Sequence, residues 1–243
     1  MVLAAEEIEA RLRAVATRER AMHERRYLKS ELDFLGATMP QIRAAVRRVA
    51  REQPRLDHDE LVTLVLALWT KPIHERRMAS VLLLGRFAVL LERGDLALVE
   101  TLLRESRTWA LVDALATDVA GTLVARDPDG VTPVLDRWAT DPDYWVRRAS
   151  LLAELRPIRD GAPLDRFLAR AEPMLEEREF FIRKAIGWVL REAGKGRPDE
   201  VAAWLGPRTH RASGVTMREA VKYLSDEVSA ALIAAYREGR PAT

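Results

Sequence analysis

The sequence predicts an all-α protein built from successive helix pairs. Apolar residues recur at the i, i+3, i+4 and i+7 positions of a helix along nearly the whole chain of 243 residues. Strand signals are weak, because the Asp-Gly pair at Asp129 and Gly130 is not flanked by alternating apolar residues. An internal repeat of 35 or 36 residues indicates that the helices form repeated pairs.

The expected helices follow one another with short connections. Asp57 with Glu60 resembles a capping box, and Thr132 before Pro133 is typical of a helix start. Three glycines are expected in the links between helices: Gly94, Gly130 and Gly161. In chain order, the helices are expected over residues 3–26, 39–52, 58–70, 73–92, 95–106, 108–125, 132–140, 143–155, 164–175, 178–193, 198–205, 215–224 and 226–238.

The repeat is visible when five short segments are aligned on their central residues. The steps between these residues are 36, 35, 36 and 35 positions. A unit of this length holds one helix pair and is slightly shorter than the roughly 40–47 residues of HEAT and armadillo units. The five central residues, which we call the charged row, are Arg77, Asp113, Arg148, Lys184 and Glu219.

Repeats of this kind predict a right-handed α-solenoid of HEAT-like helix pairs with a concave groove. We expect a single domain over residues 1–243, with N-terminal capping helices in 1–37, repeats in 38–225 and a C-terminal cap in 226–243. Caps are needed because each pair buries its apolar face only against its neighbours.

Residues four positions before the charged row form a second row, which we call the ring row. Rings interleaved with cations suit a sugar-phosphate backbone, because cations neutralise phosphates and rings pack on sugars and base edges. Large rings at helical spacing are also typical of a core, and the aliphatic ends of the row favour that interpretation. The ring row consists of Ile73, Trp109, Tyr144, Phe180 and Val215.

Composition excludes several classes of protein. The chain has 48% hydrophobic and 31% charged residues, an ordinary globular balance, and no apolar run of membrane-spanning length. Its N-terminus carries acids where a signal peptide would be basic, so we expect a cytoplasmic protein. Cysteine is absent, which excludes disulfides and thiolate chemistry, and the four histidines lack metal-ligand spacing, so no metal is expected. The net charge of +2 with clustered basic residues permits a nucleic-acid partner.

Several short fragments stand out by their order and spacing along the chain. The fragments are Tyr27-Leu28-Lys29, Phe34-Leu35-Gly36 ahead of Pro40 and Arg43, Trp109 with Asp113, Trp145-Val146-Arg147-Arg148, and Phe180-Phe181-Ile182-Arg183-Lys184-Ala185-Ile186-Gly187-Trp188. Together they resemble the HEAT-like-repeat DNA alkylation repair proteins, the AlkD-type alkylpurine DNA glycosylases, and the resemblance covers most of the chain. The chain departs from the family pattern at Thr108, where a second tryptophan is common, and at Met39, where a threonine is common.

The resemblance implies an enzyme that removes cationic N3- or N7-alkylated purines from duplex DNA without drawing the base into a tight pocket. It implies that Trp109, Asp113, Arg148 and Trp188 surround the lesion. A cationic base leaves as a neutral molecule, so the reaction needs a carboxylate near the oxocarbenium ion and a positioned water, which suits Asp113. The two indoles would add cation-π attraction of about 0.5–2 kcal/mol each, and Arg148 would hold a phosphate.

Other residues are expected to hold the duplex, and no cofactor is expected. The basic candidates include Arg183 and the segment of residues 208–213. We expect the protein to act as a monomer that associates with the nucleoid when bound to DNA. The expected DNA-binding residues are Tyr27, Lys29, Arg43, Arg47, Arg77, Tyr144, Phe180, Phe181, Lys184 and Arg211.

Each of these assignments has an alternative. Asp113 and Arg148 also fit surface or structural ion pairs, Trp109 and Trp188 also fit packing between helices, and the basic residues also fit a solvated face. Trp69, Trp138 and Trp204 fall outside both rows and are expected in the core. At the level of the whole protein, the alternatives are a non-catalytic binder of branched or distorted DNA and a scaffold that binds other proteins.

Overall fold

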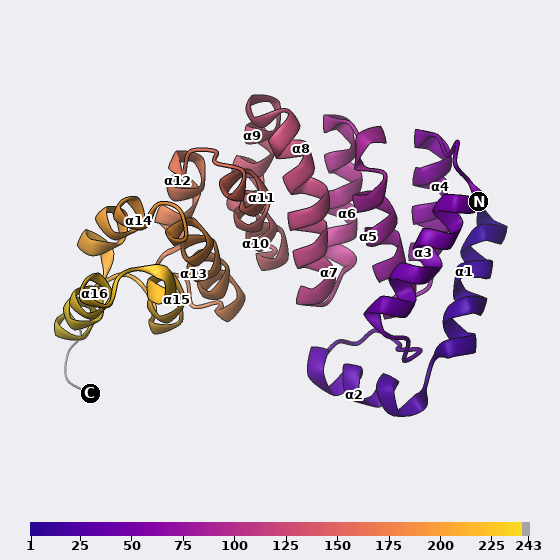
Figure 1. Cartoon of the computed structure of the whole chain (residues 1–243), viewed down its shortest axis with the longest axis horizontal. Helices are drawn as coiled ribbons and strands as arrows, with labels where there is room; N and C mark the ends of the chain where they lie inside the picture. The colour runs from indigo at the N-terminus through magenta and orange to yellow at the C-terminus, as the bar shows by residue number, and fades with distance from the viewer. Residues whose placement is uncertain (240–243) are drawn as a thin grey trace. The chain divides into compact units, whose positions relative to one another are not determined.

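A computed structural model describes residues 1–239, and these form helices joined by short turns (Figure 1). Within the described residues, β-type pairing is limited to an isolated bridge between Asp33 and Ile73. The all-α prediction is therefore confirmed. The chain forms two compact units, Met1–Leu123 and Val124–Thr243, which are described separately below.

The first unit packs α1, α3, α4 and α5 against one another, and α5 also packs against α7 and the π-helical segment that follows it (Figure 1). Its core is aliphatic, with Leu61, Leu64 and Leu68 of α4 fully buried. The elements are α1 (Val2–Val15), α2 (Arg18–Leu28), α3 (Met39–Glu52), α4 (His58–Trp69), α5 (His74–Arg86), η1 (Ala88–Leu90), η2 (Arg93–Asp95), α6 (Leu96–Glu105), α7 (Trp109–Ala114), the π-helical segment η3 (Leu115–Ala120) and α8 (Gly121–Arg126), which crosses the division between the units.

The second unit stacks α9 on α10, α10 on α13 and α13 on α15. Trp138 and Phe167 lie fully buried in its core. The elements are α9 (Pro128–Ala139), α10 (Tyr144–Leu152), α11 (Leu155–Arg159), α12 (Asp165–Met174), α13 (Phe180–Gly194), α14 (Pro198–Leu205), η4 (Gly206–Arg208), α15 (Gly214–Ala220), η5 (Val221–Tyr223) and α16 (Asp226–Glu238).

The repeat has a direct structural counterpart. In each repeat the ring-row residue stands at the start of a helix, and the charged-row residue stands one turn later in the same helix. The sequence spacing of 35 or 36 residues therefore reflects the starts of α5, α7, α10, α13 and α15, which lie 34 to 36 residues apart. The predicted cap and repeat boundaries of a single domain remain a prediction, and residues 240–243 of the expected C-terminal cap lie outside the described residues.

Several predicted helix boundaries are wrong, among them the end of the helix expected over residues 73–92, which stops at Arg86. Two others have a clear local cause. The helix expected over residues 3–26 is divided, because Ala16 is extended and the hydroxyl of Thr17 accepts from the amide of Arg20 to begin α2. The helix expected from residue 132 begins at Pro128, because the carboxylate of Asp127 caps it. Gly130 consequently lies inside α9 rather than in a link.

The helix expected over residues 108–125 is continuous but irregular. It begins as α7, passes through the π-helical segment η3 and continues as α8. Single π-helical turns inside α-helices are frequent at functional sites, because they change the direction of the side chains that follow. Here the π-helical segment begins two residues after Asp113.

The tryptophans outside the two rows divide into two groups. Trp69 and Trp138 are 4% and 0% exposed, so their prediction as core residues is confirmed. Trp204 is only half-buried, and the guanidinium of Arg208 lies 5.0 Å from the centre of its ring. The core prediction for Trp204 is therefore wrong, because its outer face serves as a platform for a cation.

Candidate functional site

Helix α7 presents Trp109 and Asp113 on one side. Thr108 is 1% exposed and caps the helix with its side chain, so the residue that departs from the family pattern has a structural purpose here. Leu111 and Val112 are fully buried and hold the opposite side of the helix in the core. Trp109 and Asp113 remain half-buried, which gives both side chains access to solvent.

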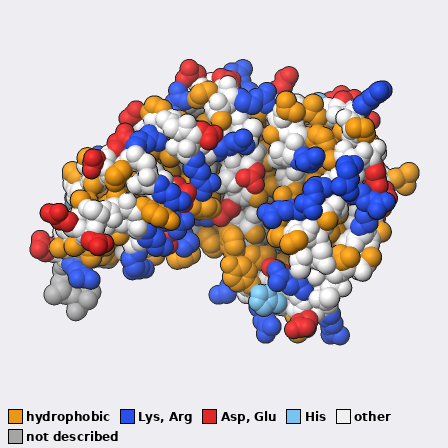
Figure 2. Space-filling model, viewed as in Figure 1, with side chains coloured by type: hydrophobic (Ala, Val, Ile, Leu, Met, Phe, Trp, Pro, Cys, Tyr) orange, Lys and Arg blue, Asp and Glu red, His pale blue; other side chains and the backbone are white. Residues whose placement is uncertain are grey.

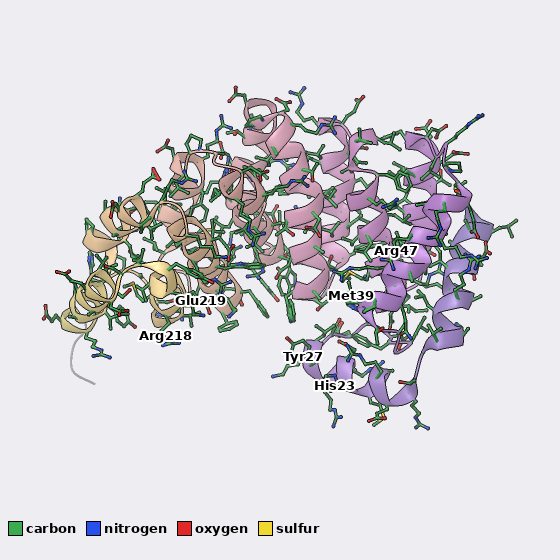
Figure 3. The ribbon with its side chains drawn as sticks, viewed as in Figure 1. His23, Tyr27, Met39, Arg47, Arg218 and Glu219 are labelled. Carbon is green, nitrogen blue, oxygen red and sulfur yellow. The ribbon has the colours of Figure 1, made fainter. Side chains whose placement is uncertain are left out.

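The indole of Trp109 belongs to an aromatic cluster with α2. The ring of Tyr27 meets it edge to face, with the centroids 5.8 Å apart and the planes at 81°. His23 stacks on the other side of Tyr27 at 6.4 Å, and both residues are on α2 (Figure 3). We call His23, Tyr27 and Trp109 the first aromatic cluster. Because Tyr27 is 62% exposed, the cluster has a solvent-facing surface.

The segment that follows α2 is fixed to α5 by one buried carboxylate. Glu75 is 1% exposed and accepts hydrogen bonds from the amides of Leu35, Gly36 and Ala37 at 3.0, 2.6 and 3.2 Å. Gly36 has a φ of +98°, and a Cβ there would lie 2.0 Å from the carbonyl oxygen of Thr17. The sequence around Glu75 gives no signal of this role, since its partners are about 40 residues away.

Two further contacts hold the segment that follows α2, one with the residue two positions before α7 and one with α5. Arg107, which has a left-handed φ of 51° directly before α7, donates to the carboxylate of Glu31 at 2.7 Å. His74, at the start of α5, is 6% exposed and stacks on Phe34 with the rings 5.1 Å apart. Burial lowers the pKa of His74 to about 4, so the imidazole is neutral at physiological pH.

The second unit carries a larger aromatic cluster on α10 and α13. Tyr144 and Phe181 are stacked, with the centroids 6.3 Å apart and the planes at 7°. Trp145 lies 4.7 Å from Phe181, and Phe180 meets Phe181 edge to face at 5.4 Å. We call Tyr144, Trp145, Phe180 and Phe181 the second aromatic cluster. Phe180 is 50% exposed, so this cluster also reaches solvent.

Two arginines of the charged row lie inside the protein, contrary to the exposed position that a phosphate contact requires. Arg148 is 3% exposed, and its Nη1 donates to the carbonyl oxygen of Phe181 while the guanidinium lies 5.7 Å over the ring of that residue. Arg77 is 8% exposed, and its Nη1 donates to the carbonyl oxygen of Glu105. Each arginine therefore connects its helix to the next repeat.

The remaining basic candidates differ between the units. Lys29, Arg43 and Arg47 are exposed, and basic side chains gather over α3 in the first unit (Figures 2 and 3). In the second unit, Lys184 donates to Glu219 at 3.3 Å, and Arg211 donates to Glu176 at 2.6 Å and also pairs with Glu172. The cations expected to bind DNA in the second unit are therefore already paired with carboxylates.

Trp188 is half-buried on α13, one helical turn beyond Lys184. Arg191, which is not among the expected DNA-binding residues, follows Trp188 by three residues and so shares its side of the helix. This spacing is the sequence signal that identifies it. Arg183, another basic candidate, is engaged by its Nε with the carbonyl oxygen of Glu177 at 2.6 Å.

The described part of the chain, residues 1–239, contains no group of three or more His, Asp or Glu side chains arranged to hold a metal ion. Its helices are too short or too polar for any of them to cross a bilayer.

Comparisons with known proteins agree with the fold. A family described as DNA alkylation repair enzyme matches residues 8–224. A predicted DNA alkylation repair enzyme from Enterococcus faecalis is 23% identical and superposes over 87% of this chain and 97% of its own, with a TM-score of 0.79. AlkD2 from Streptococcus mutans is 18% identical over 74% of this chain and 88% of its own, with a TM-score of 0.60. A search of curated proteins finds no match.

Proposed function

Because the chain belongs to the DNA alkylation repair enzyme family, we propose that it is a monofunctional DNA glycosylase. Its substrate would be duplex DNA that contains a cationic purine alkylated at N3 or N7. The observation that carries this proposal is the half-buried carboxylate of Asp113, one turn beyond an indole that belongs to a solvent-facing aromatic cluster. A surface that only binds DNA gains nothing from a carboxylate at this position, because it repels phosphates.

In the proposed reaction, the bond between C1′ of the sugar and the base nitrogen breaks, and its electron pair neutralises the cationic base. The base leaves without a general acid. The sugar becomes an oxocarbenium ion, which the negative charge of Asp113 stabilises. A water molecule held by the same carboxylate adds its oxygen to C1′ and transfers a proton to that carboxylate, as in glycoside hydrolysis.

The aromatic side chains would bind the nucleotide through their faces. The indole of Trp109 lies against Tyr27, and a flat cationic base on such rings gains cation-π attraction of about 0.5–2 kcal/mol per ring. Trp188 is the second indole in this proposal. Binding against open ring faces leaves room for bulky adducts and does not require the base to enter a tight pocket.

The proposed contacts with the DNA backbone follow from exposure. Lys29, Arg43 and Arg47 are exposed in the first unit and suit phosphates directly. Arg148 is buried, so we assign it the role of holding Phe181 and, through that ring, the second aromatic cluster. A direct phosphate contact by Arg148 would require its guanidinium to leave the carbonyl oxygen of Phe181.

The test is single-turnover release of base from a duplex that contains one 7-methylguanine. We expect Asp113→Asn to lower the rate by about 10²–10³, the usual effect of losing one stabilising group, and to retain DNA binding. The matched control is Asp118→Asn, because Asp118 is an exposed carboxylate in the same continuous helix. Wild-type protein that binds the duplex but releases neither 7-methylguanine nor 3-methyladenine would instead identify a non-catalytic binder of distorted DNA.

A further inference from the structure

Trp188 is flanked by two cations on its own helix. Lys184, Trp188 and Arg191 occupy the i, i+4 and i+7 positions of α13 and therefore share one side of the helix. None of the three is fully buried. This side of α13 is the one that meets α15.

A single carboxylate of α15 gathers these cations. Glu219 accepts from Lys184 Nζ through Oε1 at 3.3 Å and pairs with Arg191 Nη1 through Oε2 at 2.5 Å. Lys222, in η5, places its Nζ 3.0 Å from the same Oε2. The Glu219 side chain is only 12% exposed, so the carboxylate lies beneath the three cations rather than beside them in solvent.

The position of Glu219 depends on a close crossing of α13 and α15. Gly187 stands at the crossing, and a Cβ there would lie 2.7 Å from the Cβ of Glu219 and 3.0 Å from the carbonyl oxygen of Thr216. Figure 3 shows Glu219 on the side of α15 toward α13, whereas Arg218 points away. Glycine therefore permits the approach that brings the carboxylate up to the Trp188 side of α13.

The cluster retains a net positive charge. Burial raises the pKa of Glu219, but hydrogen bonds and charge from Lys222 and Lys184 outweigh it, so the pKa lies below its ordinary value and the group is ionised. Three cations around one carboxylate leave a charge of about +2, which suits one phosphodiester group.

We propose that Glu219 is a positioning residue that arranges Lys184, Arg191 and Lys222 as a binding site for one DNA phosphate beside Trp188. The carboxylate holds three long side chains in one geometry, which reduces the conformational entropy lost on binding. The site lies within the second unit and involves residues of α13, α15 and η5. It rests on the proposed function only in taking DNA as the ligand.

Glu219→Gln provides a test in which two explanations predict opposite changes in the affinity for undamaged duplex. The substitution removes one negative charge, so simple electrostatics predicts tighter binding of an undamaged duplex. Loss of positioning predicts weaker binding by about threefold to tenfold, with the slope of log K against log salt reduced by about 0.9, the value of one phosphate contact. We expect the second result.

Glu192→Gln is the matched control. Glu192 is also on α13, its side chain is 7% exposed, and it holds two cations, Arg159 at 3.0 Å and Lys195 at 2.9 Å. Its Oε1 also lies 3.6 Å from Arg191 Nε, so the control tests that longer contact as well. Both variants change the net charge equally, and we expect Glu192→Gln to leave affinity unchanged or to raise it.

A second pair of variants decides the matter if Glu219→Gln unfolds, as a thermal melt would reveal. Lys222 is 49% exposed and pairs with Glu219, whereas Lys195 is 46% exposed and pairs with Glu192. We expect Lys222→Met to weaken duplex binding more than Lys195→Met does. Lys222→Met should also show the smaller slope of log K against log salt. Equal affinities in this pair, or tighter binding by a folded Glu219→Gln, would overturn the proposal. These outcomes depend on binding alone, so they differ from a failure of base release.

Discussion

Helices α7 and α10 begin alike and differ one turn later. Thr108 and Asp143 cap them with their side chains, and each helix then presents a ring-row residue. In α10 the charged-row residue is Arg148, which is 3% exposed and donates to a carbonyl oxygen of the following repeat, as Arg77 does in α5. In α7 the residue is the half-buried Asp113.

The difference shows that arginine in this row serves to join consecutive repeats. An ionised aspartate has no donor and cannot donate to a carbonyl oxygen of the next repeat, so Asp113 in α7 does not make the connection that the arginines make. The charged row is therefore not a uniform binding surface. Two of its arginines donate to carbonyl oxygens of the following repeat, and its carboxylate in α7 is the candidate for chemistry.

The most severe test of this comparison is to give α7 the residue that α10 carries. Asp113→Arg should lower single-turnover base release by at least about 10², because the charge near the oxocarbenium ion changes from stabilising to repelling. Affinity for undamaged duplex should rise, since a cation replaces an anion. Retention of base release in this variant would remove Asp113 from the reaction.

Acidification should weaken the first unit through His74. In the folded state the His74 imidazole has a pKa of about 4, whereas in the unfolded state it has its ordinary pKa of 6.5. Between these values the unfolded state binds more protons, so stability falls as the pH drops from about 6.5 toward 4, by up to about 3 kcal/mol. Urea unfolding at several pH values would measure this fall in the free energy of unfolding. Hydrogen exchange should show that protection is lost in α5 at a higher pH than in α13.

The control for the pH effect is His74→Gln, which cannot take up a proton. Its stability should depend less on pH across the same interval, although it loses the stacking with Phe34. An identical pH dependence in the two proteins would assign the effect to other groups.

Arg148→Ala should destabilise the second unit by about 2 kcal/mol, because it removes a part-buried, charge-assisted hydrogen bond to a carbonyl oxygen. Arg159→Ala is a suitable comparison, since Arg159 is 50% exposed and its ion pair with Glu192 should contribute little. Chemical denaturation measures both. Equal small effects would mean that Arg148 is not a structural joint, and the phosphate role predicted for it would regain support.

The smallest effect is expected at Tyr27. Tyr27→Ala removes the edge contact with Trp109 and should lower base release by about threefold to tenfold, in line with about 0.5–1.5 kcal/mol for an aromatic pair. Tyr223→Ala serves as the control, because Tyr223 is 52% exposed and lies against Lys195 in the second unit. Equal rates in the two variants would separate the first aromatic cluster from the reaction.

Much of the fold followed from local patterns in the sequence. Helical periodicity and the spacing of 35 or 36 residues identified the helix starts, and the four-residue step from Trp109 to Asp113 placed both on one side of α7. What depends on the next repeat could not be predicted. The burial of Arg148 is set by Phe181, and the group around Glu219 depends on a close approach at Gly187.

The π-helical segment that follows α7 affects how relatives should be aligned. A turn closed by an i to i+5 hydrogen bond contains one residue more than an α-helical turn. A relative that lacks this turn would match the chain only with a single-residue gap between positions 115 and 120. A gap placed earlier would put a different residue opposite Asp113. Insertions near this segment should therefore be placed by superposing the backbones rather than by sequence identity.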